Sequence, residues 1–294
     1  MKKVLVIGDV IDDIVVRPLG LIRTDTDTKS DIQITSGGSA ANFACWLASF
    51  GVSVTLYSRV NRRDVARFEA ELSNFKVETA LQGDPEVPTG AIVILVEGQT
   101  RTFLTQRGAN QNLDLAPAIE MVKDFDLVYI SGYSIVGSSQ PQLVARLLER
   151  AAELGVPVAC DPGSAGFIAD FGVQNFLNLT AGIDYLLPSL EEGKVLSGED
   201  RAEVIAEFLL QHYKSVVVTQ GSTGAFFASQ MQRSRAEAKQ ADLVDATGAG
   251  DAFAAGFLAA TLKGQSVEAA LDLAAKTGAI AVTLVGGRPL LAKN

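Results

Sequence analysis

The sequence has few of the residues that build metal and redox centres: two cysteines and one histidine among 294 residues. Cys45 and Cys160 follow no metal-binding or redox spacing, and each lies in an apolar run typical of buried thiols. A Ser–His–Asp hydrolase or a histidine metal site would depend on His212 alone, whose helical context indicates a surface residue. We therefore expect acid–base chemistry here to use carboxylates.

A basic surface is also missing, because 25 Lys and Arg stand against 34 Asp and Glu, giving a net charge of −9. This balance excludes a general nucleic-acid or membrane-surface binder. No apolar run reaches membrane-spanning length, and the opening M-K-K-V-L-V-I-G-D is too short for a signal peptide and is broken by Asp9. We expect a cytoplasmic protein that holds any anionic ligand by local N–H groups, a few Lys or Arg, and a metal.

Short apolar runs alternate with helical patterns along most of the chain. Strands that alternate with helices predict βαβ units, a parallel sheet and right-handed crossovers, and 294 residues allow one large α/β domain. The expected buried strands are residues 4–8, 54–57, 127–131, 156–160, 185–187 and 216–219. The expected helices are residues 40–50, 140–154, 201–213, 250–263 and 267–283.

Two stretches interrupt this alternation. Residues 14–34 contain β-branched residues but no helical pattern, and within 89–105 the run A-I-V-I-L-V-E, G-Q, T-R-T-F-L-T predicts a hairpin. Together they predict a small projecting sheet, inserted as segments of about 14–36 and 88–107. We interpret it as a lid that excludes water, with an apolar face where two subunits could meet as a homodimer. The alternative is a pair of edge hairpins without a role.

Residues 245–251 read D-A-T-G-A-G-D and lead into an alanine-rich helical run. Small residues before a helix leave backbone N–H groups unpaired, and the helix dipole adds about half a positive charge, so this end suits a phosphate. Asp251 would repel that ligand, so its presence needs an explanation. It is explained if Asp251 takes a proton from a hydroxyl while the N–H groups stabilise a transferring phosphoryl group. The alternative is close packing, with Asp251 merely favouring the helix start.

Two motifs near the N-terminus offer ligands for an acceptor. G-D-V-I-D-D places Asp13 at the carboxyl end of the first strand, the edge where open parallel sheets bind ligands. In S-G-G-S-A-A-N, residues 36–42, Gly37 and Gly38 permit close backbone approach, and Asn42 can donate to and accept from a polyol hydroxyl.

Two further motifs follow strands in the C-terminal half. V-V-V-T-Q-G-S-T-G-A contains a tight turn suited to a nucleotide, and L-L-P-S-L-E-E places carboxylates where one could hold Mg²⁺ through water. The residues concerned are Thr219, Gly221 and Gly224 in the first motif, and Glu191 and Glu192 in the second. A glycine turn is commonly only structural, and a surface Glu pair is commonly only solvated. The motifs become informative together, because each follows a strand of the alternating strand–helix pattern.

The chain resembles the PfkB (ribokinase-like) family of carbohydrate kinases. The matching residues are G-G-S-A-A-N and D-A-T-G-A-G-D-A-F-A-A-G-F, and the resemblance spans nearly the whole chain. It implies a ribokinase-like three-layer sandwich over residues 1–294, with a mostly parallel central sheet and a small β lid. It also implies an ATP-dependent kinase that uses Mg²⁺ and K⁺ and phosphorylates a hydroxymethyl group of a small sugar.

The resemblance also implies roles for individual residues. Asp251 resembles the catalytic base, and the residues that resemble an anion hole are Thr247, Gly248, Ala249 and Gly250. Substrate ligands would be Asp13, Gly37, Gly38, Asn42 and Asn110, the last from the region 90–110, where we expect specificity to be set. Thr219, Gly221 and Gly224 would line ATP together with Thr247, Gly248 and Gly250. Glu192 would organise Mg²⁺ through water, and a monovalent-cation site would use Asp245, Thr247 and carbonyls near residues 282–287.

The sequence also departs from the family pattern. Ser189 stands where P-N-x-x-E has Asn, Ser39 replaces the Lys usual in ribokinases, and R-V-N-R-R-D at 59–64 replaces a glycine–acid turn. Arg101 and Arg107 lie in or beside the lid and could meet an anionic group. An adenosine- or pseudouridine-type nucleoside kinase and a non-catalytic sugar-binding homologue remain alternatives. A nicotinamide oxidoreductase is excluded, because no G-x-G-x-x-G follows the first strand.

Overall fold

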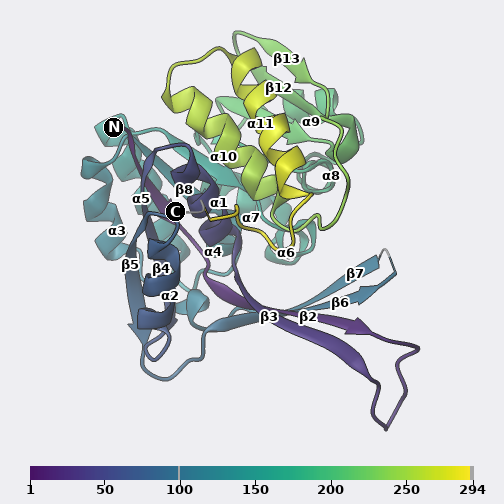
Figure 1. Ribbon diagram of the computed structural model, residues 1–294. Coiled ribbons are helices and arrows are strands. Elements are labelled where there is room, and N and C mark those ends of the chain that lie inside the picture. The colour runs from purple at the N-terminus through teal and green to yellow at the C-terminus, as the bar shows by residue number, and fades with distance from the viewer. Residues whose placement is uncertain (99, 292–294) are drawn as a thin grey trace.

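A computed structural model describes residues 1–98 and 100–291 and contains a large, mostly parallel sheet (Figure 1). Its order is β13-β12-β11-β10-β9-β8-β1-β4-β5, and only the β11–β12 and β12–β13 pairings are antiparallel. The strands are β1 (Lys3–Ile7), β4 (Ser53–Asn61), β5 (Val77–Asp84), β8 (Leu127–Ser131), β9 (Val158–Asp161), β10 (Tyr185–Leu186), β11 (Ser215–Thr219), β12 (Ala225–Ser229) and β13 (Arg233–Ala236).

Helices cover both faces of this sheet and complete three layers (Figure 1). One face packs against α1 (Ser39–Ser49), α2 (Val65–Ser73), α10 (Ala249–Leu262) and α11 (Val267–Ala281). The opposite face packs against α3 (Ala116–Met121), α5 (Pro141–Leu154), α6 (Ala165–Phe171), α7 (Val173–Thr180), α8 (Leu190–Ser197) and α9 (Ala202–Leu209). The short helix α4 (Gly132–Val136) and the 3₁₀ turns η1 (Gly108–Asn112), η2 (Val122–Asp124) and η3 (Gly221–Thr223) lie in the connections.

Strand β1 shows why the sheet is buried on both sides. Val4 and Val6 belong to one hydrophobic core, whereas Leu5 and Ile7 belong to the other. Since side chains alternate along a strand, a continuous apolar run supplies both cores at once. The sheet thus forms a rigid platform, and its carboxyl edge holds the candidate site.

A second sheet projects from the main body, as Figure 1 shows. It has the order β3-β2-β6-β7, formed by β2 (Ile11–Pro18), β3 (Ser30–Gly37), β6 (Gly90–Glu97) and β7 (Thr100–Gln106). Register gives it two different faces. The Asp13 face carries Asp13, Val15, Ile92, Ile94, Phe103 and Arg101, and the Ile34 face carries Ile14, Val16, Ile32, Ile34, Val93, Leu95 and Leu104.

The predicted α/β architecture is confirmed, and most predicted elements lie within one or two residues of the observed ones. The helix expected over 201–213 ends at Leu209, and the strand expected over 156–160 begins at Val158. The placement of Asp13 is corrected: it lies in β2 of the second sheet, not at the end of a central strand. The apolar segment after Asp9 simply continues into a new strand. Among the described helices, none has the length and apolarity needed to cross a membrane.

Candidate active site

The N-terminus of α10 is shaped by Gly248, its N-cap residue, which has a φ of 74°. A side chain there would be strained, and its Cβ would lie 2.5 Å from Cα of Gly287. The backbone N–H groups of Gly248 and Gly250 donate no hydrogen bond to any residue in the described ranges. The turn therefore presents free donors at the positive end of a 14-residue helix, the arrangement predicted for anion binding.

Asp251 is the third residue of α10 and is only 8% exposed. The Ser39 hydroxyl donates to its Oδ1 at 2.7 Å, and the Asn42 amide donates to its Oδ2 at 3.2 Å. Burial raises the pKa of Asp251 to about 7, although these two hydrogen bonds lower it, and the charges of Asp9 and Asp13 raise it further. A carboxylate that titrates near neutral pH, with a lone pair left on each oxygen, is suited to accept a proton.

Four of the predicted acceptor ligands, Asp13, Gly37, Gly38 and Asn42, lie near this carboxylate. Asp13 is 7% exposed, and its side-chain carboxylate accepts no hydrogen bond from the described residues. Burial raises its pKa to about 7, with the nearby charge of Asp9 adding to the shift and that of Arg288 opposing it. Gly37 lies against the Asp13 carboxylate, and Gly38 begins α1 over the Asp9 carbonyl. A polyol hydroxyl is the kind of ligand that such a buried, unused acceptor requires.

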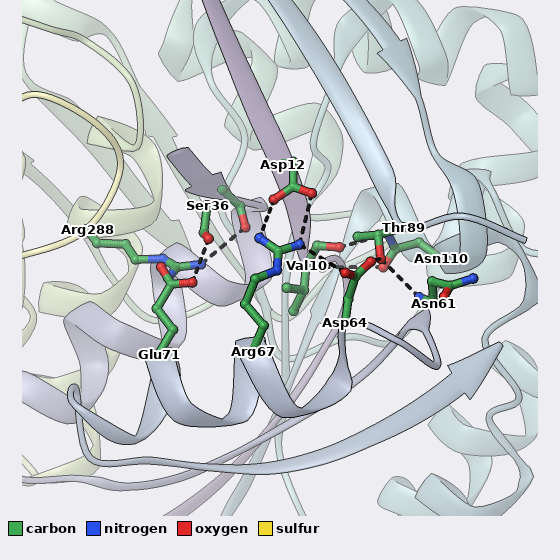
Figure 2. A network of polar contacts seen from close by, with 11 residues as sticks. Val10, Asp12, Ser36, Asn61, Asp64, Arg67, Glu71, Thr89, Asn110 and Arg288 are labelled. Carbon is green, nitrogen blue, oxygen red and sulfur yellow. Dashed lines mark hydrogen bonds and ion pairs between the residues drawn. The ribbon is translucent and has the colours of Figure 1, made fainter. Parts of the chain in front are cut away.

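Helix α2 fixes the root of the second sheet, as Figure 2 shows. Arg67 makes a bidentate ion pair with Asp12 at 2.8 and 3.0 Å. Ser36 donates to Glu71 at 2.6 Å, and Arg288 donates to the other oxygen of Glu71 at 2.7 Å. Because Asp12 and Ser36 belong to β2 and β3, these contacts hold the neighbouring Asp13 in place.

A cavity of about 210 Å³ opens beside the α10 N-terminus. Its lining includes Ser39, Tyr133, Asp161, Ser189, Glu192, Thr219, Gly248, Ala249, Gly250 and Asp251. Burial raises the pKa of Asp161 well above its usual range, and the charges of Glu192 and Asp251 add to this. Burial likewise raises the pKa of Glu192. Two acids that oppose each other's ionisation fit a Mg²⁺ ion, which is commonly held by one or two carboxylates plus phosphates.

Ser189 shows what its departure from the family pattern does locally. It is the N-cap of α8, where its hydroxyl accepts from the Glu192 N–H at 3.3 Å. The Glu192 carboxylate accepts in return from the Ser189 N–H at 2.8 Å. This capping box uses one oxygen of Glu192 and orients the side chain at the cavity. No cluster of three or more metal-ligating side chains occurs in the described part of the chain.

Two of the predicted nucleotide residues lie beyond the cavity wall. Thr219 lines the cavity at the end of β11, whereas Gly221 and Gly224 form the following turn. Gly224 has a φ of 105°, and a side chain there would overlap the carbonyl oxygen of Ala236. Close packing on the end of β13 is therefore sufficient reason for glycine at 224.

Asn110 faces the protein interior. Its Oδ1 accepts from the Val10 N–H and the Ser58 hydroxyl, each at 3.3 Å. Its Nδ2 donates to the carbonyls of Val10 at 3.1 Å and Arg107 at 3.2 Å. Since the amide is satisfied by the protein itself, Asn110 braces the segment after β7 and is left out of the proposed substrate contacts.

The expected monovalent-cation site has a different occupant. Asp245 Oδ1 lies 2.8 Å from Nη1 of Arg101 and also accepts from the Thr247 N–H and hydroxyl. The carbonyl expected to contribute at Val282 accepts the N–H groups of residues 244 and 245, and that of Gly287 accepts the indole N–H of Trp46. While the Arg101 guanidinium lies on this carboxylate, it stands where K⁺ would need a free oxygen ligand.

Four residues that line or buttress the site were not singled out from the sequence. Ser39 was noted only as a departure, yet it touches Asp251. Asp9 accepts from the Ser39 N–H at 3.0 Å and the Ser131 hydroxyl at 3.2 Å, so it orients the start of α1. Asp161 is the last residue of β9, at the same sheet edge, a position that could have identified it. Tyr133 lies in α4, a five-residue helix that is too short to show a helical pattern of apolar residues in the sequence.

Comparison with known proteins identifies the family and supports the fold. The family model described as pfkB family carbohydrate kinase matches residues 1–293. The chain is 29% identical to an ATP-dependent ribose-1-phosphate kinase of Halopiger xanaduensis, covering 98% of this chain and 94% of the relative. It is 24% identical to an ATP-dependent 6-phosphofructokinase of Thermoanaerobacterium thermosaccharolyticum, covering 96% and 88%. The crystal structure of adenosine kinase from Sinorhizobium meliloti superposes with a TM-score of 0.86, at 24% identity and coverage of 98% and 96%.

Proposed function

The chain belongs to the pfkB family of carbohydrate kinases, and from that membership we propose that it transfers the γ-phosphoryl group of ATP to a hydroxymethyl group of a small sugar. Kinases of this family act on sugars or nucleosides with ATP and Mg²⁺. The observation that carries the proposal is the buried Asp251, with a pKa raised to about 7, beside the free N–H groups of Gly248 and Gly250.

In the proposed reaction, Asp251 accepts the proton of the acceptor hydroxyl while the oxygen of that hydroxyl forms a bond to the γ-phosphorus. The bond from that phosphorus to the bridging oxygen breaks, and ADP leaves. Ser39 and Asn42 hold Asp251 in position, and the N–H groups of Gly248 and Gly250 stabilise the charge on the transferring group. Glu192 and Asp161 would hold Mg²⁺, which when bound offsets charge on the phosphates.

The acceptor would lie between Asp251 and the Asp13 face of the second sheet. Asp13 supplies a free buried carboxylate, and Oδ1 of Asn42 is buried without a hydrogen-bond partner among the described residues. Both atoms can accept from sugar hydroxyls. We interpret the second sheet as a lid inserted into one domain, because it brings Asp13 to the site and can exclude water there.

Arg107 favours an acceptor that carries a negative charge. Its Nη1 and Nη2 are buried and make no hydrogen bond within the described part of the chain, and its guanidinium lies 5.2 Å from the ring centroid of Tyr133, a residue of the cavity lining. Burial lowers the pKa of Arg107, although the charge of Asp9 opposes this. Burying a guanidinium without an anionic partner costs free energy, so a carboxylate or phosphate on the acceptor would pair with Arg107 and offset that cost. Relatives named for ribose-1-phosphate and 6-phosphofructose kinase activity support this class.

An acceptor screen coupled to ADP release tests the proposal. We would compare ribose with ribose 1-phosphate, fructose with fructose 6-phosphate, and add 2-keto-3-deoxygluconate, adenosine and pseudouridine. Turnover of the charged sugars, with a raised KM for them alone in Arg107→Gln, is the expected result. Faster turnover of a nucleoside would instead assign a nucleoside kinase on the same fold. Tight sugar binding without turnover of any acceptor would indicate a non-catalytic homologue.

The Ile34 face of the second sheet supports a homodimer. Ile32, Ile34 and Leu104 are 59%, 70% and 59% exposed on this face, which points away from Asp13 and carries Asp12 at its root and Glu97 at the opposite end of β6. The exposed aliphatic stretch between these two carboxylates suits a second copy of itself. Light scattering should give a dimer mass, and Ile34→Lys should give a monomer. We place the enzyme in the cytoplasm, where ATP is available to it.

A further inference from the structure

Arg101 joins the second sheet to the loop that precedes α10. It lies in β7, and its Nη1 contacts Oδ1 of Asp245 at 2.8 Å and donates to the Thr247 hydroxyl at 3.1 Å. Both side chains of the ion pair are largely buried, with 26% of Arg101 and 11% of Asp245 exposed. Asp245 and Arg101 are 144 positions apart in the sequence, so this contact exists only when the second sheet lies over the site.

A positive charge at this point has a clear electrostatic purpose. Asp245 is three residues before Gly248, and its carboxylate also binds the Thr247 N–H at 2.9 Å and the Gly286 N–H at 3.1 Å. Burial works to raise the pKa of Asp245, but these hydrogen bonds and the Arg101 charge outweigh it and hold the pKa below its usual value. Asp245 therefore stays ionised, and without a counter-charge it would repel a phosphoryl group arriving at the α10 N-terminus.

The contact occupies Oδ1 of this carboxylate, whereas Oδ2 accepts the Gly286 N–H. Oδ1 accepts two hydrogen bonds from Thr247 and forms the ion pair with Arg101, and the Thr247 hydroxyl accepts from Arg101 while it donates to Asp245. A monovalent cation placed here would lose the hydroxyl as a ligand and would lie beside a guanidinium of the same charge.

We propose that the Arg101 guanidinium takes the place of a monovalent cation at Asp245, so that phosphoryl transfer by this enzyme needs no K⁺. Arg101 acts as a positioning residue: it neutralises Asp245 and fixes Thr247, and through them the turn that holds the free N–H groups. Because Arg101 and Asp13 share one face of the second sheet, the counter-charge and the acceptor ligand arrive together. This inference rests on the proposed kinase function.

The test compares wild type, Arg101→Ala, Arg101→Lys and the matched control Arg17→Ala. Arg17 lies in the same sheet, and its ion pair with Asp31 is remote from Asp245. Each protein is dialysed free of K⁺, and its Tm and ATP turnover are measured in KCl and in tetramethylammonium chloride of equal ionic strength. The Tm comparison requires no substrate, so it tests cation binding even if every acceptor in the screen fails.

In wild type, Arg101→Lys and Arg17→Ala, we expect the Tm and the turnover to be the same in both salts. Arg101→Ala should lose turnover by roughly tenfold or more in tetramethylammonium, the effect of one charge-assisted hydrogen bond, and K⁺ should restore much of it while raising the Tm. A K⁺-specific rise in the wild-type Tm or turnover would overturn the proposal. So would an Arg101→Ala protein that shows no response to K⁺, whether or not its turnover falls.

Discussion

Replacing Asp251 with Asn should abolish most of the turnover while leaving the folded protein at least as stable. The amide keeps the volume of the side chain, and the Ser39 hydroxyl can rotate so that both polar contacts of residue 251 are retained. What is lost is the proton acceptor. A positioned base contributes about 10²–10⁴ in rate, or roughly 3–5 kcal/mol at the transition state.

The pKa shift of Asp251 gives the sign of the stability change. The pKa rises from 3.8 to about 7 on folding, so the folded state binds this proton more tightly than the unfolded state does. Stability from this group is therefore present at low pH and falls as pH rises through the interval between about 4 and 7. At 1.36 kcal/mol per pKa unit the loss is at most roughly 4 kcal/mol, and the Asn variant avoids it. Above pH 7 the variant should therefore unfold at the same or higher denaturant concentration.

Three measurements check this prediction: ADP release with the preferred acceptor, calorimetric binding of ATP, and urea unfolding at pH 8. Asp272→Asn is the matched control, because that carboxylate pairs with Lys239 and Lys276 on the surface of α11. Near-normal turnover in Asp251→Asn would refute the assignment of the base. Lost turnover together with lost ATP binding would show instead that Asp251 serves nucleotide binding.

The other predictions concern the surroundings of this carboxylate and the nucleotide turn. Ser39→Ala removes a hydrogen bond that lowers the pKa of Asp251, so the rising limb of kcat/KM against pH should move to higher pH by about one unit; an unmoved profile would argue against Asp251 as the titrating group. Asp13→Ala should raise the acceptor KM by about 10- to 100-fold while the ATP KM stays constant, since only the acceptor would contact it; equal changes in both constants would contradict its role. Gly224→Ala should destabilise the fold by roughly 2 kcal/mol or more in urea unfolding, because residue 224 has a φ of 105° and its side chain would overlap Ala236.

The sequence allowed prediction of those elements whose pattern is local. Apolar runs identified six central strands, and the small residues before an alanine-rich run identified the α10 N-terminus with Asp251 in its first turn. Strands β12 and β13 were missed because their pairing is antiparallel at the sheet edge, where A-F-F-A-S and R-S-R-A give only short and mixed signals. Helix α2 was missed because only Phe68 and Leu72 are buried on it.

Site residues were harder to predict where their role depends on tertiary contacts. Ser39 and Asp251 are 212 positions apart, and nothing in the spacing of either motif shows that they touch. Asn110 was expected as a substrate ligand in the region that sets specificity, but it turns inward to Val10 and Ser58. The cation expected at Asp245 was inferred from the family resemblance, whereas an arginine from a distant hairpin meets the same carboxylate. Local pattern thus predicts which segments carry chemistry, and packing decides which atoms remain available for it.

The pleat of the second sheet has a consequence for how this protein can change over evolution. Asp13 and Arg101 alternate along their strands with Ile14 and Thr102, so opposite faces are separated by a single residue. An insertion or deletion of one residue in β2 or β7 would reverse the faces downstream of it, withdrawing a site residue and directing its neighbour toward Asp251. Length changes should therefore be tolerated in the connection between β2 and β3 but not within the paired strands. The register of this sheet thus restricts sequence change as strongly as the identity of its residues does.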